Sequence, residues 1–412
     1  MRKLYLLLDD WDNDRNFVGR ELELLASKYE VTVLCDSAVA DRLPGVRYII
    51  YKEPGKTRMF VSALKLIADI DAWRELIRAS VYRSYVGSGI CARISEVLRF
   101  YIKADLFRTF LYNEGCIEDG ALYYSYWNFR KCYAVTHEIS KYKNSRIISR
   151  IHGYDLYDEQ IPSGYQPFKI SMDTVLDKLI FVSEHGMEYY LNKYGRKGSK
   201  YELRFLGTKW HNDTETYERR EEMTIVSCSR IDECKRVGRI VEALSLIKGV
   251  NVRWVHFGDG VLGDEVRELA GELLTKNPCV KYEFRGNVPN AEIHDFYRRE
   301  LIDAFITSSM SEGNPVSVME AMSYGIPVIA PSICNFPNMI AGCGIMVSDK
   351  CLPSEMAGVI EDLRKMPPEK IMELRRNARS RWEKNYDAML NSRRFVEEVL
   401  EPLELKIKDE RR

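Results

Sequence analysis

The stretch "SEGNPVSVMEAMSYGIPVIA", residues 311–330, decides the fold that this sequence predicts. It follows the apolar run "DAFITSS" at 303–309 and itself ends in another run typical of a strand. Pro315 suits the first turn of a helix, because its missing N–H would have no partner there in any case. Gly325 followed by Pro327 ends that helix. Strand, loop, helix and strand in this order form the repeating unit of a parallel sheet.

The remainder of the second half repeats this unit. Helix-period segments alternate with short β-rich runs, which lie at 224–229, 252–258, 280–286, 303–309, 326–331 and 344–348. Several of these runs are nearly all apolar, as expected when helices cover both faces of a sheet. The second half therefore predicts a doubly wound parallel sheet.

The first half has the same rhythm with one interruption. Its strand-like runs lie at 4–10, 31–36, 46–52, 121–127, 145–153 and 178–184. We predict an α/β fold of two Rossmann-like, doubly wound domains facing a central cleft. The N-terminal domain spans 1–208 and carries a helical insertion at about 57–114, the C-terminal domain spans 209–380, and a helical tail at 381–412 packs back on the first domain. Two domains agree with a chain of 412 residues.

Composition narrows the class of protein. The chain has 61 basic and 61 acidic side chains, so no overall field favours nucleic acid. Ten cysteines without a C-x-x-C pair indicate reduced thiols rather than a disulfide framework or a zinc site. The start "MRKLYLLLDD" is typical of a first strand rather than a signal peptide, and no apolar run is long enough to span a bilayer. We expect a cytoplasmic protein.

The quoted stretch also carries two carboxylates at a position where ligands bind. Glu312 lies in the predicted loop and Glu320 about one turn inside the predicted helix. The free N–H groups at Val316 to Val318 would attract an anion. A carboxylate is a paired acceptor that can hold two adjacent hydroxyls of a sugar ring. The alternative is a solvated loop charge and an acid favoured by the helix dipole, and chemistry alone leaves both readings open.

Several motifs together resemble the family-4 glycosyltransferases of the GT-B fold, which retain anomeric configuration. The second half resembles them in "SCSRIDECKRV", "FGDG", "FRGNVPNAEIHDFY" and the E-x7-E pattern of "EGNPVSVMEAMSYGIPVIA". In the first half, "YYSYW", "SRIHGYDLY" and "LDKLIFVSEHGMEYYLNKYG" resemble the bacterial branch that builds capsular, exopolysaccharide or lipopolysaccharide chains. The resemblance covers the second half and about 121–208, whereas 53–115 match nothing in the family.

The resemblance implies roles for the residues of the second half. Glu312 would contact hydroxyls of the donor sugar, and Glu320 would hold the ribose of the nucleotide. Arg230 and Lys235 would bind the diphosphate, because a leaving nucleoside diphosphate develops negative charge that fixed cations stabilise. Arg236 follows Lys235 and is an alternative for that role. Further contacts to sugar and phosphate would come from Asn314, Pro315, Val316 and Ser317.

Other positions follow from the same resemblance. His152 ends a strand in "RIHGYDLY" and matches a family histidine near the donor sugar, although a lone histidine is often structural. Gly286 and Val288, in the loop "FRGNV", would offer backbone groups to the base, unless this loop is simply a strand exit. Gly19 is what remains of the paired glycines that the family has on the phosphate side.

The predicted activity is transfer of a hexosyl group from a UDP- or GDP-linked sugar to a glycan or lipid-linked acceptor, in cell-surface polysaccharide synthesis. No metal or other cofactor is required on this reading. The acidic run "DDWDND" at 9–14 resembles a metal site only superficially, because acids after a first strand usually solvate a loop. Two alternatives stay open, a non-catalytic nucleotide-sugar-binding or scaffold subunit and a GT-B epimerase.

The insertion raises a question about membranes. Residues 73–110 carry six Arg and one Lys against three acids, interleaved with aromatic and aliphatic side chains. Such a segment could lie on an anionic membrane surface near a lipid-linked acceptor. It could equally be an ordinary pair of helices with Arg on the outer face. A peripheral contact with the inner face of the cell membrane is therefore an expectation to test.

Overall fold

The computed structural model describes residues 1–83, 87–209 and 217–403. Parts of three predicted segments lie outside these residues: 84–86 of the basic insertion, 210–216 near the start of the predicted C-terminal domain, and 404–412 of the tail. The chain forms two compact units. Unit 1 comprises Met1–Phe205 with Leu390–Arg412, and unit 2 comprises Leu206–Met389.

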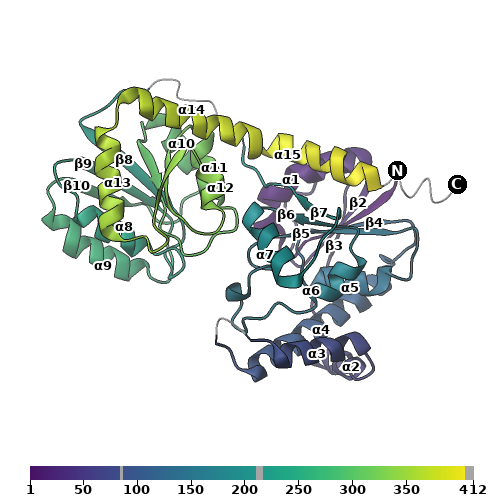
Figure 1. Cartoon of the computed structure of the whole chain (residues 1–412). Coiled ribbons are helices and arrows are strands. Elements are labelled where there is room, and N and C mark those ends of the chain that lie inside the picture. Colours follow the sequence, from purple (N-terminus) through teal and green to yellow (C-terminus); the bar gives the residue numbers. More distant parts are fainter. Residues whose placement is uncertain (84–86, 210–216, 404–412) are drawn as a thin grey trace. The chain divides into compact units, whose positions relative to one another are not determined.

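Unit 1 is built on a seven-stranded parallel sheet in the order β3-β2-β1-β4-β5-β6-β7 (Figure 1). Its strands are β1 (Lys3–Leu7), β2 (Glu30–Cys35), β3 (Arg47–Ile50), β4 (Leu122–Ser125), β5 (Arg146–Ile151), β6 (Lys178–Phe181) and β7 (Tyr201–Leu203). The strand order reverses between β1 and β4, which is where open α/β sheets bind ligands.

Helices cover both faces of this sheet. They are α1 (Trp11–Lys28), α2 (Lys56–Leu66), α3 (Ile70–Val81), α4 (Ile90–Asn113), α5 (Arg130–Ile139), α6 (Lys169–Val175) and α7 (Glu184–Tyr194), with a short 3-10 turn, η1 (Asp158–Gln160). On one face, Val18 and Leu22 of α1 pack with Phe395 and Val399 near the end of the chain. On the other face, α4 packs on α5, and both α2 and α3 pack on α4.

Unit 2 contains a six-stranded parallel sheet in the order β10-β9-β8-β11-β12-β13. Its strands are β8 (Glu222–Cys228), β9 (Asn251–Phe257), β10 (Val280–Phe284), β11 (Ala304–Ile306), β12 (Val328–Pro331) and β13 (Gly344–Val347). Its helices are α8 (Val237–Ser245), α9 (Gly263–Leu273), η2 (Leu274–Lys276), α10 (Asn290–Arg299), α11 (Val316–Ser323), α12 (Phe336–Ile340), α13 (Pro353–Lys365) and α14 (Pro368–Asn385). After them come α15 (Ala388–Phe395) and η3 (Val396–Leu400). The strand order reverses between β8 and β11.

Together with β11 before it, the stretch at 311–330 forms the predicted strand, loop, helix and strand. Its helix α11 packs on α14, and Gly325 at its end has a φ of +64°. A Cβ there would lie 3.1 Å from the Arg375 carbonyl oxygen, so the tight passage from α11 to β12 needs a glycine. Pro315 immediately precedes the helix, which begins at Val316.

The predicted fold class is confirmed, because both units are Rossmann-like parallel sheets covered by helices. Every predicted strand is present, and β7 was missed because three residues carry no readable periodicity. The first segment of unit 1 ends at Phe205, and its second segment begins at Leu390. The tail was expected from residue 381, but Trp382 of α14 is fully buried within unit 2 and donates to the Thr208 hydroxyl at 2.7 Å. No helix within the described residues is both long and apolar enough to cross a membrane.

Candidate functional site

Two loops meet at the point where the strand order of unit 2 reverses. One follows β8 and contains Cys234 and Lys235, and the other follows β11 and contains Ser308 and Met310. The N–H of Met310 donates to the carbonyl of Cys234 at 2.7 Å. The Ser308 hydroxyl lies 2.9 Å from the carbonyl oxygens of both Lys235 and Arg236. Backbone and hydroxyl contacts therefore hold the two loops in a fixed relation.

Lys235 and Glu312 form an ion pair across these loops. Lys235 Nζ donates to Glu312 Oε1 at 2.5 Å, and the Ser309 hydroxyl donates to the same oxygen at 2.8 Å. The two side chains are 20% and 12% exposed, so the pair is shielded but still open to a ligand. The structure thus brings together two of the predicted catalytic residues at the switch point of the sheet.

The neighbouring cations differ in how they are used. Arg236 has a left-handed φ of 49°, and its guanidinium donates to the carbonyls of Ser308 at 2.8 Å and Ser309 at 3.2 Å. Arg236 is therefore committed to holding the loops, and Lys235 is the better candidate for a ligand. The side chain of Arg230 is 79% exposed and pairs only loosely with Asp232 at 3.3 Å, which leaves most of its donors accessible.

The start of α11 faces the surface beside this pair. Asn314, Pro315, Val316 and Ser317 are all half-buried, whereas the helix is buried from Val318 onward. Pro315, at the N-cap position, makes no side-chain cap to the helix. Anion binding by the first N–H groups of α11 stays a prediction.

Glu320 lies deeper, with 8% of the residue exposed. Its Oε1 accepts from Asn290 Nδ2 at 2.9 Å and lies 3.5 Å from His294 Nε2. His294 in turn lies 3.1 Å from the Tyr324 hydroxyl through Nδ1. Asn290 and His294 were missed in the sequence, although their spacing places both on one face of α10. They fix the orientation of the Glu320 carboxylate.

Glycines allow the next loop to lie close against the first. A Cβ at Gly258 would lie 2.0 Å from the Ser229 carbonyl oxygen, and one at Gly260 would lie 2.4 Å from that of Ile231. Gly258 also has a φ of +116°. The segment "FGDG" therefore needs its glycines to bring the backbone after β9 against the backbone after β8.

The loop after β10 completes this edge of the sheet. The N–H of Gly258 donates to the Gly286 carbonyl at 2.8 Å, and the N–H of Asp259 donates to Asn287 Oδ1 at 3.1 Å. Gly286 and Val288 are half-buried there. The backbone of this loop is thus held beside the two preceding loops, where a planar base could lie against it.

In unit 1, His152 follows β5 and is 8% exposed. Its ring lies against Trp127, with centroids 4.3 Å apart, and against Tyr126, at 4.9 Å. Neither ring nitrogen has a hydrogen-bond partner among the described residues. Burial, with a smaller contribution from the nearby positive charge of Arg150, lowers the pKa of His152 well below its usual value. The imidazole is neutral and carries two unsatisfied nitrogens.

Asp155 positions the turn that carries His152. Its carboxylate accepts the backbone N–H of His152 and that of Asn128, each at 2.6 Å. The residue is fully buried, and burial raises the pKa of its carboxyl to about 6. Asp155 ties the loop after β5 to the loop after β4 and therefore acts as a positioning residue.

Gly19 does not lie in a loop, contrary to the expectation for a phosphate-side glycine. It is inside α1, which begins at Trp11 and is held to the sheet by the buried Val18 and Leu22. Helix formation from Trp11 leaves only Leu8, Asp9 and Asp10 between β1 and α1. This is too short for a glycine-rich turn.

Carboxylates of the acidic run after β1 contact neighbouring side chains of unit 1. Asp10 accepts from the Ser37 hydroxyl at 2.9 Å. Asp14 accepts from Trp127 Nε1 at 3.1 Å, and Lys131 lies 3.6 Å from Asp9. Within the described residues, no three His, Cys, Asp or Glu side chains are grouped so as to hold a metal ion.

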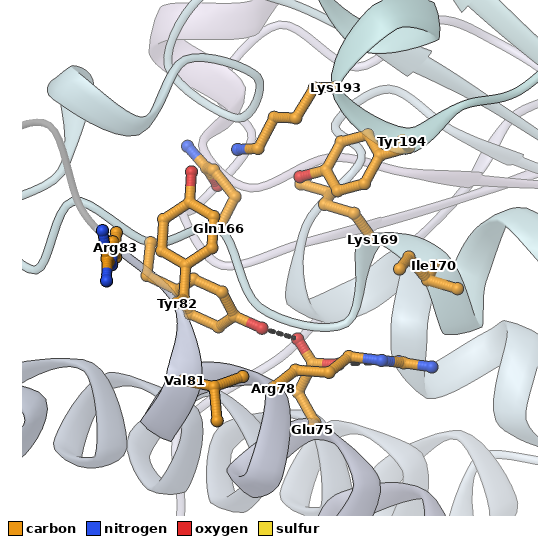
Figure 2. A pocket seen from close by; sticks show the side chains of 11 residues that line it. Glu75, Arg78, Val81, Tyr82, Arg83, Gln166, Lys169, Ile170, Lys193 and Tyr194 are labelled. Atoms are coloured by element: carbon orange, nitrogen blue, oxygen red, sulfur yellow. Dashed lines mark hydrogen bonds and ion pairs between the residues drawn. The ribbon is translucent and has the colours of Figure 1, made fainter.

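Unit 1 also contains a pocket of about 370 Å³ that the sequence did not predict (Figure 2). Cations, tyrosines and aliphatic side chains line it: Glu75, Arg78, Val81, Tyr82, Arg83, Tyr165, Gln166, Lys169, Ile170, Lys193 and Tyr194. Glu75 accepts from the Tyr165 hydroxyl and the Phe168 N–H, each at 2.7 Å. Its charge is therefore used internally, which leaves a cationic and aromatic lining.

The chain is thus a two-unit Rossmann-like protein whose unit 2 holds the loops after β8 and β11 together at the switch point of its sheet. Residues 208–381 match the family model of glycosyl transferases group 1. The matched segment is somewhat less than half of the chain. A search of curated proteins finds no match to the chain.

Solved GT-B glycosyltransferases are similar over the whole chain. The trehalose-6-phosphate synthase of Burkholderia multivorans is 12% identical, with 100% of this chain and 98% of that one covered and a TM-score of 0.69. The lipopolysaccharide outer core galactosyltransferase WaaB is 15% identical, with 96% and 99% covered and a TM-score of 0.65. HepE of Anabaena, solved with UDP and glucose, is 13% identical, with 97% and 99% covered and a TM-score of 0.63. At these identities the likeness establishes the fold.

Proposed function

We propose that this protein is a retaining glycosyltransferase of family 4. It would move a hexosyl group from a nucleoside-diphosphate sugar to a glycan or lipid-linked acceptor in cell-surface polysaccharide synthesis. The observation that carries the proposal is the Lys235–Glu312 pair at the β8–β11 switch point, within the segment that matches group 1 glycosyltransferases.

The cations of unit 2 would bind the diphosphate. Lys235 is held in place by the loop contacts of its own backbone, and its Nζ can exchange the Glu312 oxygen for a phosphate oxygen. The exposed Arg230 can close over the same phosphates. As the bond to the sugar breaks, negative charge grows on the leaving diphosphate, and both cations stabilise it.

The two glutamates would divide the donor between them. When Lys235 turns to the phosphate, Glu312 is released to accept hydroxyls of the donor sugar. Glu320 would hold the ribose hydroxyls, since Asn290 and His294 on α10 already fix its orientation. The half-buried residues from Asn314 to Ser317 would contact sugar and phosphate, and the backbone at Gly286 and Val288 would contact the base.

His152 would contact the donor sugar. A neutral imidazole offers one donor and one acceptor, and the two unsatisfied nitrogens of His152 suit a pair of sugar hydroxyls. Because its pKa is lowered, His152 would act through hydrogen bonds rather than as an acid. Burying an unpaired polar ring costs stability, and a bound sugar would remove that cost.

Retention would proceed without a carboxylate nucleophile. The acceptor hydroxyl would attack the anomeric carbon from the face that the diphosphate leaves. The bond between that carbon and the phosphate oxygen breaks, the new glycosidic bond forms, and the hydroxyl proton passes to the leaving phosphate oxygen. No metal ion is needed for this balance, since Arg230 and Lys235 supply the positive charge.

The donor would be UDP- or GDP-linked, and the UDP complex of the similar HepE structure favours UDP. The similarity to WaaB, a lipopolysaccharide galactosyltransferase, favours an acceptor of the cell-surface type. We place the reaction in the cytoplasm, with a peripheral contact between the helical insertion and the inner face of the cell membrane.

The test is release of nucleoside diphosphate from a panel of UDP- and GDP-sugars, with a bacterial lipid extract as acceptor. We expect release from one donor, its loss in Glu312→Gln, and a product with the anomeric configuration of the donor by NMR. Nucleotide binding without release from any donor would favour a non-catalytic subunit. An isomerised nucleotide sugar would favour an epimerase.

A further inference from the structure

The helix α3 presents its apolar side to solvent. A stripe at helical spacing is highly exposed, with values of 69%, 50%, 63% and 75% for Ile70, Trp73, Ile77 and Val81. The opposite side, which packs on α4, carries the buried Ala72, Glu75 and Ala79. A helix on the surface of a soluble domain normally has the reverse arrangement. The stripe therefore needs a partner outside the fold.

The helix α2 continues the same stripe. Phe60, Leu64 and Ile67 are at least half exposed, whereas Ser62 and Leu66 face inward. The indole N–H of Trp73 donates to the Ile67 carbonyl at 3.0 Å, which joins the end of α2 to α3. We call these seven exposed side chains the α2–α3 apolar face: Phe60, Leu64, Ile67, Ile70, Trp73, Ile77 and Val81.

The acids of this segment point inward. Asp69 caps α3 through the N–H groups of Asp71 and Ala72 and accepts from the Tyr101 hydroxyl. Asp71 accepts from the Ser171 hydroxyl at 2.8 Å. Glu75 is buried and pairs with Arg78 and with Tyr165. The outer surface of α2 and α3 therefore shows little negative charge.

The cations of the segment point outward. Lys56, Arg58, Arg74 and Arg83 are exposed and have no ion-pair partner within the described part of the chain. The pocket of Figure 2 lies at the end of α3, where Arg78, Val81 and Arg83 join Lys193 of α7. Both helices that carry the apolar face therefore also carry exposed, unpaired cations, and Arg83 adds another beside Val81.

Two arginines of α4 are used inside the fold and are not available to a membrane surface. Arg93 of α4 is 5% exposed and donates to the Ala79 carbonyl at 2.8 Å. Arg108 pairs with Asp105 and Glu138 inside unit 1. Two of the six arginines in 73–110 are therefore structural, and α2, outside that range, supplies part of the exposed face instead.

We propose that the α2–α3 apolar face lies on an anionic lipid bilayer. Its large side chains would enter the boundary between head groups and acyl chains, and the surrounding cations would contact lipid phosphates. Exposed apolar patches of this kind bind either proteins or membranes. The charge pattern favours a membrane, because the unpaired cations on α2 and α3 match an anionic surface, whereas the acids of the segment are used in internal contacts. The inference deepens the proposed function, since it names how the enzyme reaches a lipid-linked acceptor.

The test measures co-sedimentation of the purified full chain with vesicles, without any donor or acceptor. We expect binding to phosphatidylcholine vesicles that contain phosphatidylglycerol, with weaker binding as salt rises. Ile70→Ser with Trp73→Ser and Ile77→Ser should weaken binding at least roughly tenfold. Arg58→Gln with Arg74→Gln should weaken it about fivefold for each cation removed.

Matched variants on unit 2 serve as controls. Leu246→Ser with Met346→Ser and Leu352→Ser removes three other exposed apolar side chains, which are 42% to 46% exposed. Arg299→Gln with Lys365→Gln removes two exposed cations. These variants should bind vesicles like the unchanged protein. All variants alter exposed positions, so unchanged thermal melting would verify that they fold.

Three results would overturn the proposal. They are no binding to anionic vesicles, an equal loss of vesicle binding in the unit 2 controls, or vesicle binding that changes neither with salt nor in the α2–α3 variants. Dimerisation abolished by the α2–α3 variants, without vesicle binding, would assign the face to a second copy of the chain. Because none of these measurements uses activity, an enzyme that fails to bind vesicles would refute this inference and leave the proposed function standing.

Discussion

The two units reach the same topology and use its switch point differently. In unit 2, the loops after β8 and β11 carry an ion pair, Lys235–Glu312, whose partners are both still open to a ligand. In unit 1, the cation near the switch point between β1 and β4 is used in internal contacts. Lys131 donates to the Leu8 carbonyl and to Asp36. The neutral, unsatisfied ring of His152 follows β5 and lies against Trp127.

The difference shows what the fold decides and what the loops decide. Parallel strands and a reversal of strand order place both sets of loops where ligands bind. The charges in unit 2 suit a diphosphate, whereas the buried aromatic setting of His152 in unit 1 suits a neutral sugar. Strand order locates the sites, and a few loop residues determine their chemistry.

The largest expected effect tests whether the two glutamates of unit 2 have different roles. Glu312→Ala should lower kcat roughly 100- to 1000-fold, because it removes contacts to the transferring sugar, while nucleotide affinity changes little. Glu320→Ala should weaken nucleotide affinity roughly tenfold, because it removes the ribose contact. Isothermal titration with the nucleotide and steady-state kinetics separate the two variants. Equal, small effects from both would refute this assignment.

The second prediction concerns the contrasting residue of unit 1. His152→Phe should raise the free energy of unfolding by about 1 kcal/mol, because it removes two buried, unpaired nitrogens, and should lower kcat roughly 100-fold. Urea unfolding and kinetics measure the two effects. His185→Phe is the control, since His185 bonds to the Tyr157 hydroxyl at 2.8 Å and should lose stability instead. A His152→Phe enzyme that is destabilised yet active would show that His152 is structural.

A third prediction separates neighbouring cations in unit 2. Lys235→Gln should weaken diphosphate affinity roughly tenfold by removing one charge-assisted bond. Arg236→Gln should leave the phosphate contacts intact but lower stability by about 1 to 3 kcal/mol, because the carbonyls of Ser308 and Ser309 lose their donors. Titration with the nucleotide and urea unfolding should give opposite rankings for the two variants. The same ranking in both measurements would remove the distinction.

The smallest expected effect is a pH dependence of the free energy of unfolding, caused by a buried histidine of unit 2. His256 of β9 is fully buried, and burial lowers its pKa to about 4. Between the ordinary value near 6.5 and 4, the unfolded chain takes up a proton that the folded chain refuses, so stability falls as pH falls. The loss should reach roughly 2 to 3 kcal/mol at pH 4, with no contribution above pH 7. Urea midpoints of His256→Asn should show a shallower fall, and an unchanged slope would exclude His256 as the cause.

Much of this arrangement could be predicted from the sequence. Apolar runs alternating with helix-period segments predicted both sheets, and the E-x7-E stretch predicted the loop and helix that carry Glu312 and Glu320. The pairing of Lys235 with Glu312 could not be predicted, because it depends on loops 77 residues apart in the chain. The support of Glu320 by Asn290 and His294 depends in the same way on how α10 packs beside α11.

The errors have equally physical causes. Gly19 was expected on the phosphate side because the resemblance places paired glycines there, but it lies inside α1, which the buried Val18 and Leu22 hold to the sheet. Arg236 could not be distinguished from Lys235 by type, since only the left-handed backbone of Arg236 turns its guanidinium toward the carbonyls. The exposed face of α2 and α3 was invisible for a similar reason, because periodicity does not show which side of a helix meets the fold.

The central claim is that the loops at the β8–β11 switch point bind a nucleoside diphosphate. The most direct measurement is the thermal stability of the purified protein with UDP, GDP and ADP and their sugar conjugates, without added metal. One nucleotide, at about 100 times its dissociation constant, should stabilise the fold by roughly 2.7 kcal/mol, and the gain should shrink in Lys235→Gln and Glu320→Ala. No gain from any nucleotide in a folded sample, or a gain that both variants keep, would contradict the account.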